Sequence, residues 1–331
     1  MAAAEYGIDL GSSTIVIYAK NKGVIVTEPS VIAYDKDADR ILAYGEEAKQ
    51  MLAHTTGSVV AIRPFKSGTI SDYAMMEKFL QHFLDMALGR RAFLKPLVTI
   101  CVPAGVTKEE MRAVEAAAFQ AGARDVEIAP QTVCAAIGAG IDITKPVGNM
   151  IVDIGGYSTS IAILSVGSPV IERVVPVGGD RFTEAIARYV RRHHSLFIDT
   201  EQAEEVKRKV GTVYQSPSLI DSRVTGRNVI TGVPMTIAIT SEEVRLASRD
   251  AAGEIVDAIH SVLEKTPPEL AADIVSRGIV LTGGGALIGG FEELTEERTG
   301  INTMTAENAD LCVAEGAANY HDMMDKVSMM R

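Results

Sequence analysis

The first feature that suggests chemistry is a turn of small and hydroxyl residues near the start of the chain. Residues 7–14 read Gly-Ile-Asp-Leu-Gly-Ser-Ser-Thr, so a short apolar strand runs into this turn. Such a turn lets backbone N–H groups approach a phosphate, because no large side chain stands in the way. Ser12, Ser13 and Thr14 add hydroxyl donors, and Asp9 at the strand end could hold a hydrated Mg²⁺. An ordinary hairpin can have the same composition, so this motif alone leaves both interpretations open.

The pattern returns in residues 152–160, which read Val-Asp-Ile-Gly-Gly-Tyr-Ser-Thr-Ser. Apolar segments at 150–152 and 161–164 flank it, as the strands of a hairpin would. Two copies of one hairpin predict a duplicated fold that closes on a nucleotide. Two further glycine turns, at 178–179 and 283–285, follow predicted strands, and such turns form backbone nests that accept phosphate or sugar oxygens. The first of these precedes a predicted helix, a position suited to an anion or a ribose.

Periodicity and capping signals predict the elements around these turns. Apolar residues at helical spacing predict a helix over residues 74–88. A Thr or Asp followed three residues later by Glu or Gln predicts capping boxes at Thr107, Asp199 and Thr240. The segment Thr-Pro-Pro-Glu at 266–269 predicts another capped helix start, with proline at the first helical position. The Met-rich tail from residue 323 is expected to be frayed.

The composition fits a well-buried α/β protein of two domains or two lobes. The chain has 331 residues, of which 47% are hydrophobic and 23% charged. A net charge of −11 argues against a nucleic-acid partner, since no basic stripe is present to replace phosphate counterions. Three scattered cysteines in apolar runs predict buried thiols in a reducing compartment. The sequence has neither a signal-peptide core nor an apolar run of about 18 residues, so the expected location is the cytosol.

The loop at residues 89–96 has an unusual composition, Gly-Arg-Arg-Ala-Phe-Leu-Lys-Pro. Phe93 and Leu94 either fold back over the core or enter the acyl boundary of a membrane. In the second case the flanking basic residues would meet anionic headgroups. One such loop binds weakly, so membrane attachment would need many copies side by side.

The order of these motifs resembles the superfold shared by actins, heat-shock chaperones and sugar kinases. The segments that carry this resemblance are 9–11, 153–156, 178–182 and 281–286. Within the superfold, four stretches resemble the MreB/Mbl family of bacterial actins. These stretches are 61–64, 135–140, 266–274 and 277–287. The resemblance runs from about residue 6 to about residue 320 without large gaps, which makes it more specific than any single motif.

The resemblance implies an α/β, actin-like two-lobed ATPase fold, made of duplicated ribonuclease-H-like domains with a nucleotide cleft between them. The first lobe would span residues 1–142, with a small insertion at about 30–72. The second lobe would span residues 143–311, with an insertion at about 182–240. The C-terminal helix, residues 312–331, would return to the first lobe.

The resemblance also implies ATP and Mg²⁺ as ligands and assigns site residues in both lobes. The implied residues are Ser12, Ser13, Thr14, Gly156, Tyr157 and Ser158 at the phosphates; Asp9 and Asp153 at Mg²⁺ through water; Gly179 and Asp180 near the ribose; Glu204, Glu205, Val206, Lys207, Gly284, Gly285, Ala286 and Leu287 around the nucleoside; and Phe93 and Leu94 at the membrane. The last assignment favours the membrane interpretation of the loop.

Three positions depart from the family pattern. The family usually has two glutamates and a proline before the alanine-rich helix expected at 133–140, and the second glutamate positions the attacking water. This chain has Pro-Gln-Thr at 130–132, and Gln131 can orient a water but cannot accept its proton. Tyr157 stands where the family has glycine, and Ser160 where it has an acid. A positive φ at Tyr157 would cost on the order of 1–3 kcal/mol.

The sequence therefore predicts a divergent, ATP-binding and filament-forming actin of the MreB/Mbl type, with weak or slow ATP hydrolysis. Its expected partners are further copies in head-to-tail protofilaments, other MreB-type paralogues, an anionic membrane surface and membrane proteins of the wall-synthesis machinery. We expect it in the cytoplasm at the inner face of the cell membrane, where it would help direct cell shape. Two alternatives stay open: a small-molecule, sugar-type kinase of the same superfold, and a co-assembling filament partner that binds nucleotide poorly.

Overall fold

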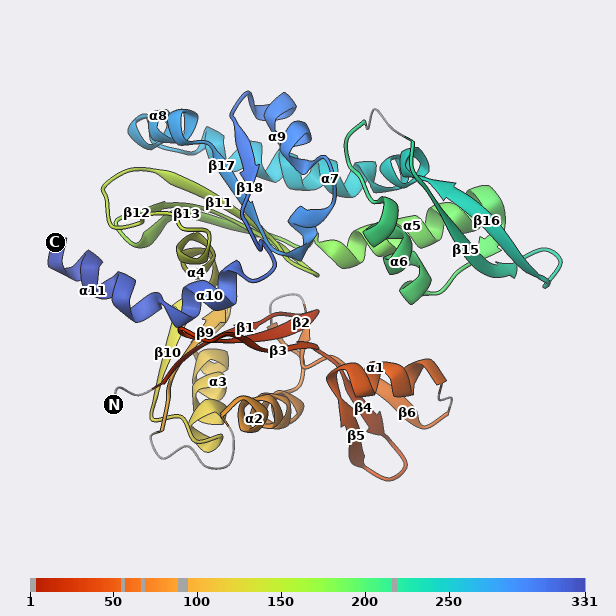
Figure 1. Ribbon diagram of the computed structural model, residues 1–331, viewed down its shortest axis with the longest axis horizontal. Helices are drawn as coiled ribbons and strands as arrows, with labels where there is room; N and C mark the ends of the chain where they lie inside the picture. The colour runs from red at the N-terminus through yellow and green to blue at the C-terminus, as the bar shows by residue number, and fades with distance from the viewer. Residues whose placement is uncertain (1–3, 55–56, 67–68, 89–94, 216–218, 331) are drawn as a thin grey trace.

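The computed structural model describes residues 4–54, 57–66, 69–88, 95–215 and 219–330. Two lobes, each built around a five-stranded sheet, lie one above the other in Figure 1. Smaller sheets of two and three strands are attached to them. Among the described residues, no helix is both long and apolar enough to cross a membrane.

The lower lobe in Figure 1 centres on a sheet with the strand order β10-β9-β1-β2-β3. Its strands are β1 (Glu5–Leu10), β2 (Thr14–Ala19), β3 (Gly23–Pro29), β9 (Leu97–Val102) and β10 (Asp125–Pro130). β1 pairs antiparallel with β2 and parallel with β9. The apolar faces of α2 (Tyr73–Leu88) and α3 (Lys108–Gln120) pack on this sheet and form one core with it.

The upper lobe repeats this topology with the order β13-β12-β11-β17-β18. Its strands are β11 (Asn149–Ile154), β12 (Thr159–Ser165), β13 (Ser168–Val175), β17 (Ile279–Thr282) and β18 (Thr303–Thr305). β11 pairs antiparallel with β12 and parallel with β17, as β1 does with β2 and β9. α7 (Ser241–Glu264), α8 (Pro268–Arg277) and α9 (Phe291–Thr299) surround the core of this sheet. The duplication predicted from the two hairpins is therefore present in the fold.

Two smaller units project toward the same end of the molecule, at the right of Figure 1. The unit on the lower lobe contains β4 (Ile32–Asp35), β5 (Arg40–Tyr44), α1 (Gly45–His54) and β6 (Val59–Ile62). β7 (Phe65–Lys66) and β8 (Thr69–Ile70) follow as a separate two-stranded sheet, and Phe65 packs in the core of the lower lobe. The unit on the upper lobe contains α5 (Gly179–His194), β14 (Leu196–Phe197), α6 (Thr200–Val210), β15 (Asp221–Asn228) and β16 (Pro234–Thr240). α1 and α6 thus stand on opposite sides of the space between the lobes.

α4 (Gln131–Gly138) and α10 (Cys312–Ala318) cross between the two sheets with their backbones in close contact. A Cβ atom built on Gly138 would lie 1.9 Å from the carbonyl oxygen of Cys312. One built on Gly316 would lie 1.8 Å from the carbonyl oxygen of Cys134. The crossing therefore requires glycine in both helices. All three cysteines are buried free thiols, as the sequence predicted.

The predicted capping boxes are confirmed at the starts of α3, α6 and α7. The predicted cap at Thr266 is wrong, because Pro267 is the N-cap of α8 and the Thr266 hydroxyl donates to the Val262 carbonyl at 2.8 Å. Proline does occupy the first helical position, at Pro268. The helix expected at 133–140 begins two residues earlier, at Gln131.

The expectation of a frayed tail is also wrong. The chain continues from α10 into a second helix, α11 (Tyr320–Met330). Val327 is 1% exposed and packs over Gly167, whose added Cβ would lie 2.9 Å from Val327 Cγ2. An apolar anchor against the upper lobe therefore holds this helix, and composition alone did not indicate it.

Candidate functional site

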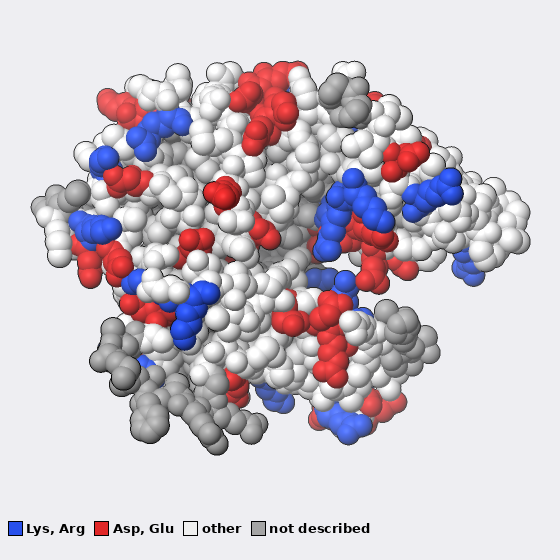
Figure 2. Space-filling model, viewed as in Figure 1, with Lys and Arg blue, Asp and Glu red and all other residues white. Residues whose placement is uncertain are grey.

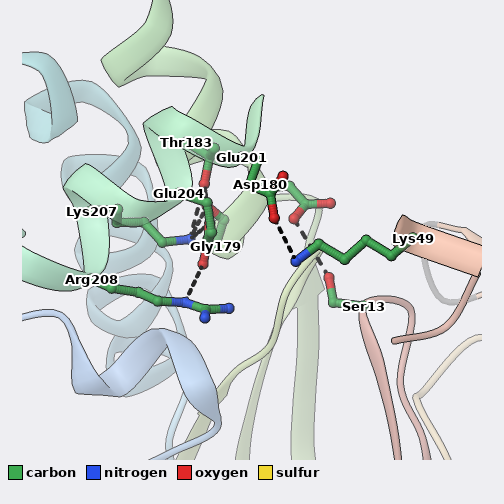
Figure 3. A network of polar contacts seen from close by, with 9 residues as sticks. All are labelled: Ser13, Lys49, Gly179, Asp180, Thr183, Glu201, Glu204, Lys207 and Arg208. Carbon is green, nitrogen blue, oxygen red and sulfur yellow. Dashed lines mark hydrogen bonds and ion pairs between the residues drawn. The ribbon is translucent and has the colours of Figure 1, made fainter. Parts of the chain in front are cut away.

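The two glycine and hydroxyl hairpins meet between the lobes. A Cβ atom built on Gly156 would lie 2.0 Å from Ser13 Oγ, so only glycine fits at this point of the second hairpin. Ser13 Oγ also lies 3.5 Å from Asp180 Oδ1 at the start of α5, at the outer limit of a hydrogen bond (Figure 3). The segments that the sequence singled out as a phosphate clamp are thus brought together from opposite lobes.

The first hairpin is held from outside by Ser30. The Ser30 hydroxyl donates to the Gly11 carbonyl at 2.6 Å, and its backbone N–H donates to the Ser13 carbonyl at 2.8 Å. Ser30 thus bonds two carbonyls of the turn and does not use the hydroxyls of Ser12 and Thr14, which are half-buried. Sequence reasoning missed Ser30, since a serine directly after a strand carries no signal of its own.

The second hairpin is joined to the start of α5. The Gly155 N–H donates to the Ser158 carbonyl at 2.9 Å and closes the turn. The N–H groups of Gly179 and Asp180 donate to the carbonyls of Gly155 and Gly156 at 2.9 and 2.7 Å. The Gly179 N–H is therefore already satisfied within the protein, so this member of the glycine pair does not offer its N–H to an anion.

Tyr157 is accommodated without the backbone strain considered from the sequence. Positive φ occurs at five described non-glycine residues, and Tyr157 is not among them. The cost of a left-handed tyrosine therefore does not arise. Tyr157 and Ser158 are both half-buried beside the hairpin contact. Ser160 pairs with Asp153 in the ladder of β11 and β12 and is buried.

Asp9 and Asp153 are the last but one residues of β1 and β11, the equivalent strands of the two sheets. Asp153 is 2% exposed and accepts hydrogen bonds from Gln131 Nε2 at 2.6 Å and Thr282 Oγ1 at 3.3 Å. Burial and then the charge of Asp153 raise the pKa of Asp9 to about 8. Burial raises the pKa of Asp153 to about 6, against the opposing effect of its two hydrogen bonds. Asp9 therefore resists ionisation beside Asp153, whereas Asp153 resists it because it is buried.

These two carboxylates fit a hydrated magnesium ion. Within the described ranges, neither forms a salt bridge, and no group of three or more potential ligands surrounds a common point. Mg²⁺ typically binds one or two carboxylates together with phosphate oxygens and keeps several waters. The half-buried Asp9 and the buried Asp153 supply that donor set, and two carboxylates alone favour contact through water over a cage of direct ligands.

The expected nucleoside side of the site carries a charged network, drawn in Figure 3. Lys207 Nζ forms an ion pair with Glu204 Oε2 at 2.6 Å and donates to the Gly179 carbonyl at 2.9 Å. Thr183 on α5 contacts both charged groups. Burial acts to raise the pKa of Glu204, but Lys207, Thr183 and Arg208 together lower it below its usual value. Glu204 is therefore a stable carboxylate at neutral pH.

The third glycine turn forms the short helix η1 (Gly284–Leu287) and lies beside the end of α6. Gly283 has φ 83°, and an added Cβ would lie 2.4 Å from the Ile154 carbonyl, so the turn packs directly on the second hairpin. The Val213 N–H donates to the Gly289 carbonyl at 2.8 Å, which joins the segment after α6 to the segment after η1. Gly284 and Leu287 are exposed, whereas Gly285 and Ala286 are buried.

Two of the implied nucleoside residues point elsewhere in this structure. Glu205 is exposed and pairs with Lys209 on the outer face of α6. Val206 is 2% exposed and belongs to the core of the smaller unit on the upper lobe. Their side chains are not among those that face Lys207, and their assignment stays a prediction. Phe93 and Leu94 lie outside the described residues.

The mouth of the site is bridged by an ion pair between the lobes. Figure 2 shows the surface hollowed between the two lobes, with basic and acidic side chains gathered on both sides. Lys49 on α1 lies 3.2 Å from Glu201 on α6, measured from Nζ to Oε1 (Figure 3). Both side chains are more than 40% exposed, so this contact joins the lobes without being buried.

Sequence reasoning also missed Thr183 and Thr282. Thr282 ends β17 and its hydroxyl contacts the candidate magnesium ligand Asp153. Thr183 lies one helical turn after Gly179, so it faces the same side of α5 as a residue that the glycine turn had marked. That spacing is the signal that could have found Thr183.

Comparison with known proteins finds one family that matches nearly the whole chain. The model of the MreB/Mbl protein family matches residues 3–329. The chain is 42% identical over 327 residues to the cell shape-determining protein Mbl of Bacillus subtilis (strain 168), covering 99% of this chain and 98% of that protein. It is 41% identical over 331 residues to the cell shape-determining protein MreB of Escherichia coli (strain K12), covering 98% and 95%.

Solved structures agree with this match. The crystal structure of MreB5 of Spiroplasma citri bound to ADP has a TM-score of 0.92 and 32% identity, covering 99% of this chain and 98% of that one. The MamK double helical filament has a TM-score of 0.82 at 20% identity, covering 97% and 99%, and at that identity it shows the shared fold alone. The actin-like fold expected from the motifs is therefore confirmed.

Proposed function

The chain belongs to the MreB/Mbl family, and we propose that it is an ATP-binding, filament-forming bacterial actin with slow ATP hydrolysis, which helps direct cell shape and wall synthesis. The observation that carries the proposal is the contact of Gly156 with Ser13, which brings the two hairpins of the duplicated fold onto one site. Residues 1–142 and 143–311 are the proposed lobes on either side of it.

Nucleotide binding is supported by the residues that surround this contact. The hydroxyls of Ser12, Ser13 and Thr14 and the hairpin at 156–158 are proposed to contact the phosphates from opposite lobes. The Glu204 and Lys207 pair, together with η1, is proposed to face the nucleoside, with Asp180 near the ribose. The related MreB5 has been solved with ADP and with AMPPNP, at 32% identity to this chain, which supports a nucleotide in the same place.

Asp9 and Asp153 are proposed to hold Mg²⁺ through water. Bound with the nucleotide, the ion supplies positive charge that neutralises the phosphate oxygens. The protein contributes two carboxylates that a cation would help to ionise, since the charge of Asp153 raises the pKa of Asp9 and burial raises the pKa of both. Thr282 and Gln131 orient Asp153 for this role by donating to its two oxygens.

Slow hydrolysis is proposed from the chemistry of Gln131. Its amide is half-buried at the first turn of α4 and donates an N–H to Asp153. The amide oxygen can accept a hydrogen bond from water and so orient it, but it does not take a proton at neutral pH. The site can therefore bind and align the reactants, while it lacks a carboxylate at this position to act as the base.

Assembly and location follow from family membership and belong to the same proposal. We propose that copies of the chain associate head to tail, alone or with MreB-type paralogues. The filaments would lie in the cytoplasm at the anionic inner face of the cell membrane, through Phe93 and Leu94, and would contact membrane proteins of the wall-synthesis machinery. Many weak membrane contacts along one filament would together give firm attachment.

Sedimentation and electron microscopy test this function. The purified chain is expected to form filaments at micromolar concentration with ATP and Mg²⁺ and to pellet with anionic vesicles. Gly156→Ala should abolish ATP-dependent sedimentation, because the new methyl group would collide with Ser13 Oγ. Gly253→Ala is the matched control, since its added Cβ would meet no atom of the described part of the chain within 4 Å beyond the local backbone of its own helix. A native chain that stays monomeric with nucleotide and lipid would contradict the proposal.

A further inference from the structure

We propose that Thr183 is a positioning residue for nucleotide binding, whose hydroxyl fixes Glu204 and Lys207 in the orientation that receives the nucleoside. This inference rests on the nucleotide-binding function proposed above. Thr183 lies on α5, behind the two charged side chains of α6, and none of the motifs recognised in the sequence includes it as a site residue.

The ammonium group of Lys207 uses all of its hydrogen-bonding capacity. It has three N–H donors, and the structure supplies an acceptor for each. These are the Gly179 carbonyl at 2.9 Å, Thr183 Oγ1 at 3.0 Å and Glu204 Oε2 at 2.6 Å. Two of the acceptors belong to α5 and one to α6, so Lys207 ties the two helices together. Its side chain is 11% exposed, which leaves little room for water to replace these partners.

The Thr183 hydroxyl is shared by both members of the charged pair. Thr183 is 2% exposed, and its Oγ1 lies 2.6 Å from Glu204 Oε2 and 3.1 Å from the Gly179 carbonyl. Its single proton goes to Glu204, because the shorter contact is to a charged acceptor. A lone pair of the same oxygen accepts from Lys207. One hydroxyl therefore sets the position of a carboxylate and an ammonium at once.

Thr183 links the second hairpin to the nucleoside side of the site, because it lies on α5, whose start is bonded to that hairpin. The start of α5 is fixed by the bonds from Gly179 and Asp180 to the hairpin carbonyls. Thr183 is β-branched, so it has few side-chain rotamers in a helix, whereas long Glu and Lys side chains have many. An ion pair between residues three apart on one helix would not hold them alone. Glu204 keeps lone pairs that can accept hydrogen bonds from ribose hydroxyls.

Calorimetric titration of the full chain with two ligands tests the inference. Mg²⁺-ATP contains the nucleoside, and Mg²⁺-tripolyphosphate presents phosphates alone. We expect Thr183→Val to bind ATP about tenfold more weakly, the factor for a lost hydrogen bond to a charged group, and to bind tripolyphosphate with unchanged affinity. Thr183→Ser restores the hydroxyl and is expected to recover ATP affinity to within about twofold of the native value. If the valine variant does not fold, Thr183→Ala removes the same hydroxyl with less bulk.

Thr295→Val is the matched control for this exchange. Thr295 is buried, and its Oγ1 has no hydrogen-bond partner among the residues that the structure describes. Equal losses of ATP affinity in Thr183→Val and Thr295→Val would overturn the inference. Unchanged ATP affinity in Thr183→Val, or an equal loss of tripolyphosphate affinity, would also overturn it. A native chain that binds neither ligand overturns the proposed function and this inference with it, which distinguishes the two failures.

Discussion

Gln131 Nε2 donates a hydrogen bond to Asp153 Oδ2 at 2.6 Å, which joins the first residue of α4 to a carboxylate of the candidate magnesium site on β11. The bond fixes the orientation of the amide, with its N–H group toward Asp153. The amide oxygen is left as the acceptor available to a water molecule. Gln131, the position that we propose for orienting the water, therefore presents an acceptor that cannot act as a base.

Replacing Gln131 by glutamate supplies the missing proton acceptor. We expect Gln131→Glu to release phosphate from ATP about 100-fold faster than the native chain, the lower end of a typical general-base contribution. A phosphate-release assay at saturating ATP and Mg²⁺ measures this. Gln131→Ala removes the amide without adding a base and should be no faster than the native chain. Equal rates in the glutamate and alanine variants would place the activation of water elsewhere.

The two buried carboxylates give the chain a characteristic pH dependence. The folded pKa values of Asp9 and Asp153, about 8 and about 6, lie above the ordinary aspartate value of 3.8. Between about pH 4 and 8 the folded state therefore binds more protons than the unfolded state, and the free energy of unfolding falls as pH rises. Urea denaturation without nucleotide or metal should give lower stability at pH 8 than at pH 5.

Two asparagine variants test which carboxyl groups cause this pH dependence of stability. Asp9→Asn removes the group with the higher pKa and should flatten the dependence between about pH 6 and 8. Asp142 is the control, because its hydrogen bonds with Thr144 and Lys145 lower its pKa to about 2. The stabilising contribution of Asp142 is present above its unfolded pKa and is lost as pH falls. Asp142→Asn should therefore change the pH dependence of the free energy of unfolding only below about pH 4. Stability that increases from pH 5 to 8 in the native chain would be incompatible with this assignment.

The ion pair between Lys49 and Glu201 should slow the release of nucleotide, because it bridges the mouth of the site. Exposed pairs contribute less than about 1 kcal/mol, so Lys49→Glu should speed release by up to about fivefold. Stopped-flow displacement of a fluorescent ATP analogue measures the rate. The effect should vanish in high salt, and the double variant Lys49→Glu, Glu201→Lys should recover the native rate.

The pair formed by Lys209 and Glu205 is the control for that experiment. It lies on the same helix α6 but joins neighbouring turns of that helix and does not reach the lower lobe. Lys209→Glu should therefore leave the release rate unchanged. Equal acceleration in Lys49→Glu and Lys209→Glu would attribute the effect to net charge and not to the bridge.

The parts of the fold that could be predicted from sequence depend on local rules. The capping boxes at Thr107, Asp199 and Thr240 each satisfy backbone groups within four residues, so the sequence alone specifies them. The two hairpins were recognisable because each combines a strand, a glycine turn and a second strand. Their contact through Gly156 and Ser13 was expected only from the duplication and from family resemblance.

The parts that could not be predicted depend on contacts between distant segments. The Thr183 hydroxyl gains its role from α6, which packs beside α5 and contributes Glu204 and Lys207. The tail is held as a helix because Val327 packs over Gly167, which is far away in the sequence. No local pattern contains the distance between such segments, so periodicity and spacing cannot reveal these contacts.

The helix crossing of α4 and α10 is the most sterically demanding contact of this kind, and it yields a prediction about stability. A methyl group at Gly316 would lie 1.8 Å from the Cys134 carbonyl, so the two helices must separate to admit it. We expect Gly316→Ala to lower the free energy of unfolding by about 3 kcal/mol, the upper end of typical overpacking costs.

Gly253 is a glycine at which alanine is expected to stabilise the fold, in contrast to Gly316. It lies inside α7, and apart from the local backbone of that helix no atom of the described residues lies within 4 Å of an added Cβ, so alanine only removes conformational freedom from the unfolded chain. Gly253→Ala should therefore raise the free energy of unfolding by about 0.5–1 kcal/mol. Thermal melts of both variants should shift in opposite directions, by roughly 1–2 °C per kcal/mol, since the shift falls as the chain gets longer. If Gly316→Ala were more stable than the native chain, α4 and α10 would separate without cost. The close crossing of these two helices would then not contribute to stability.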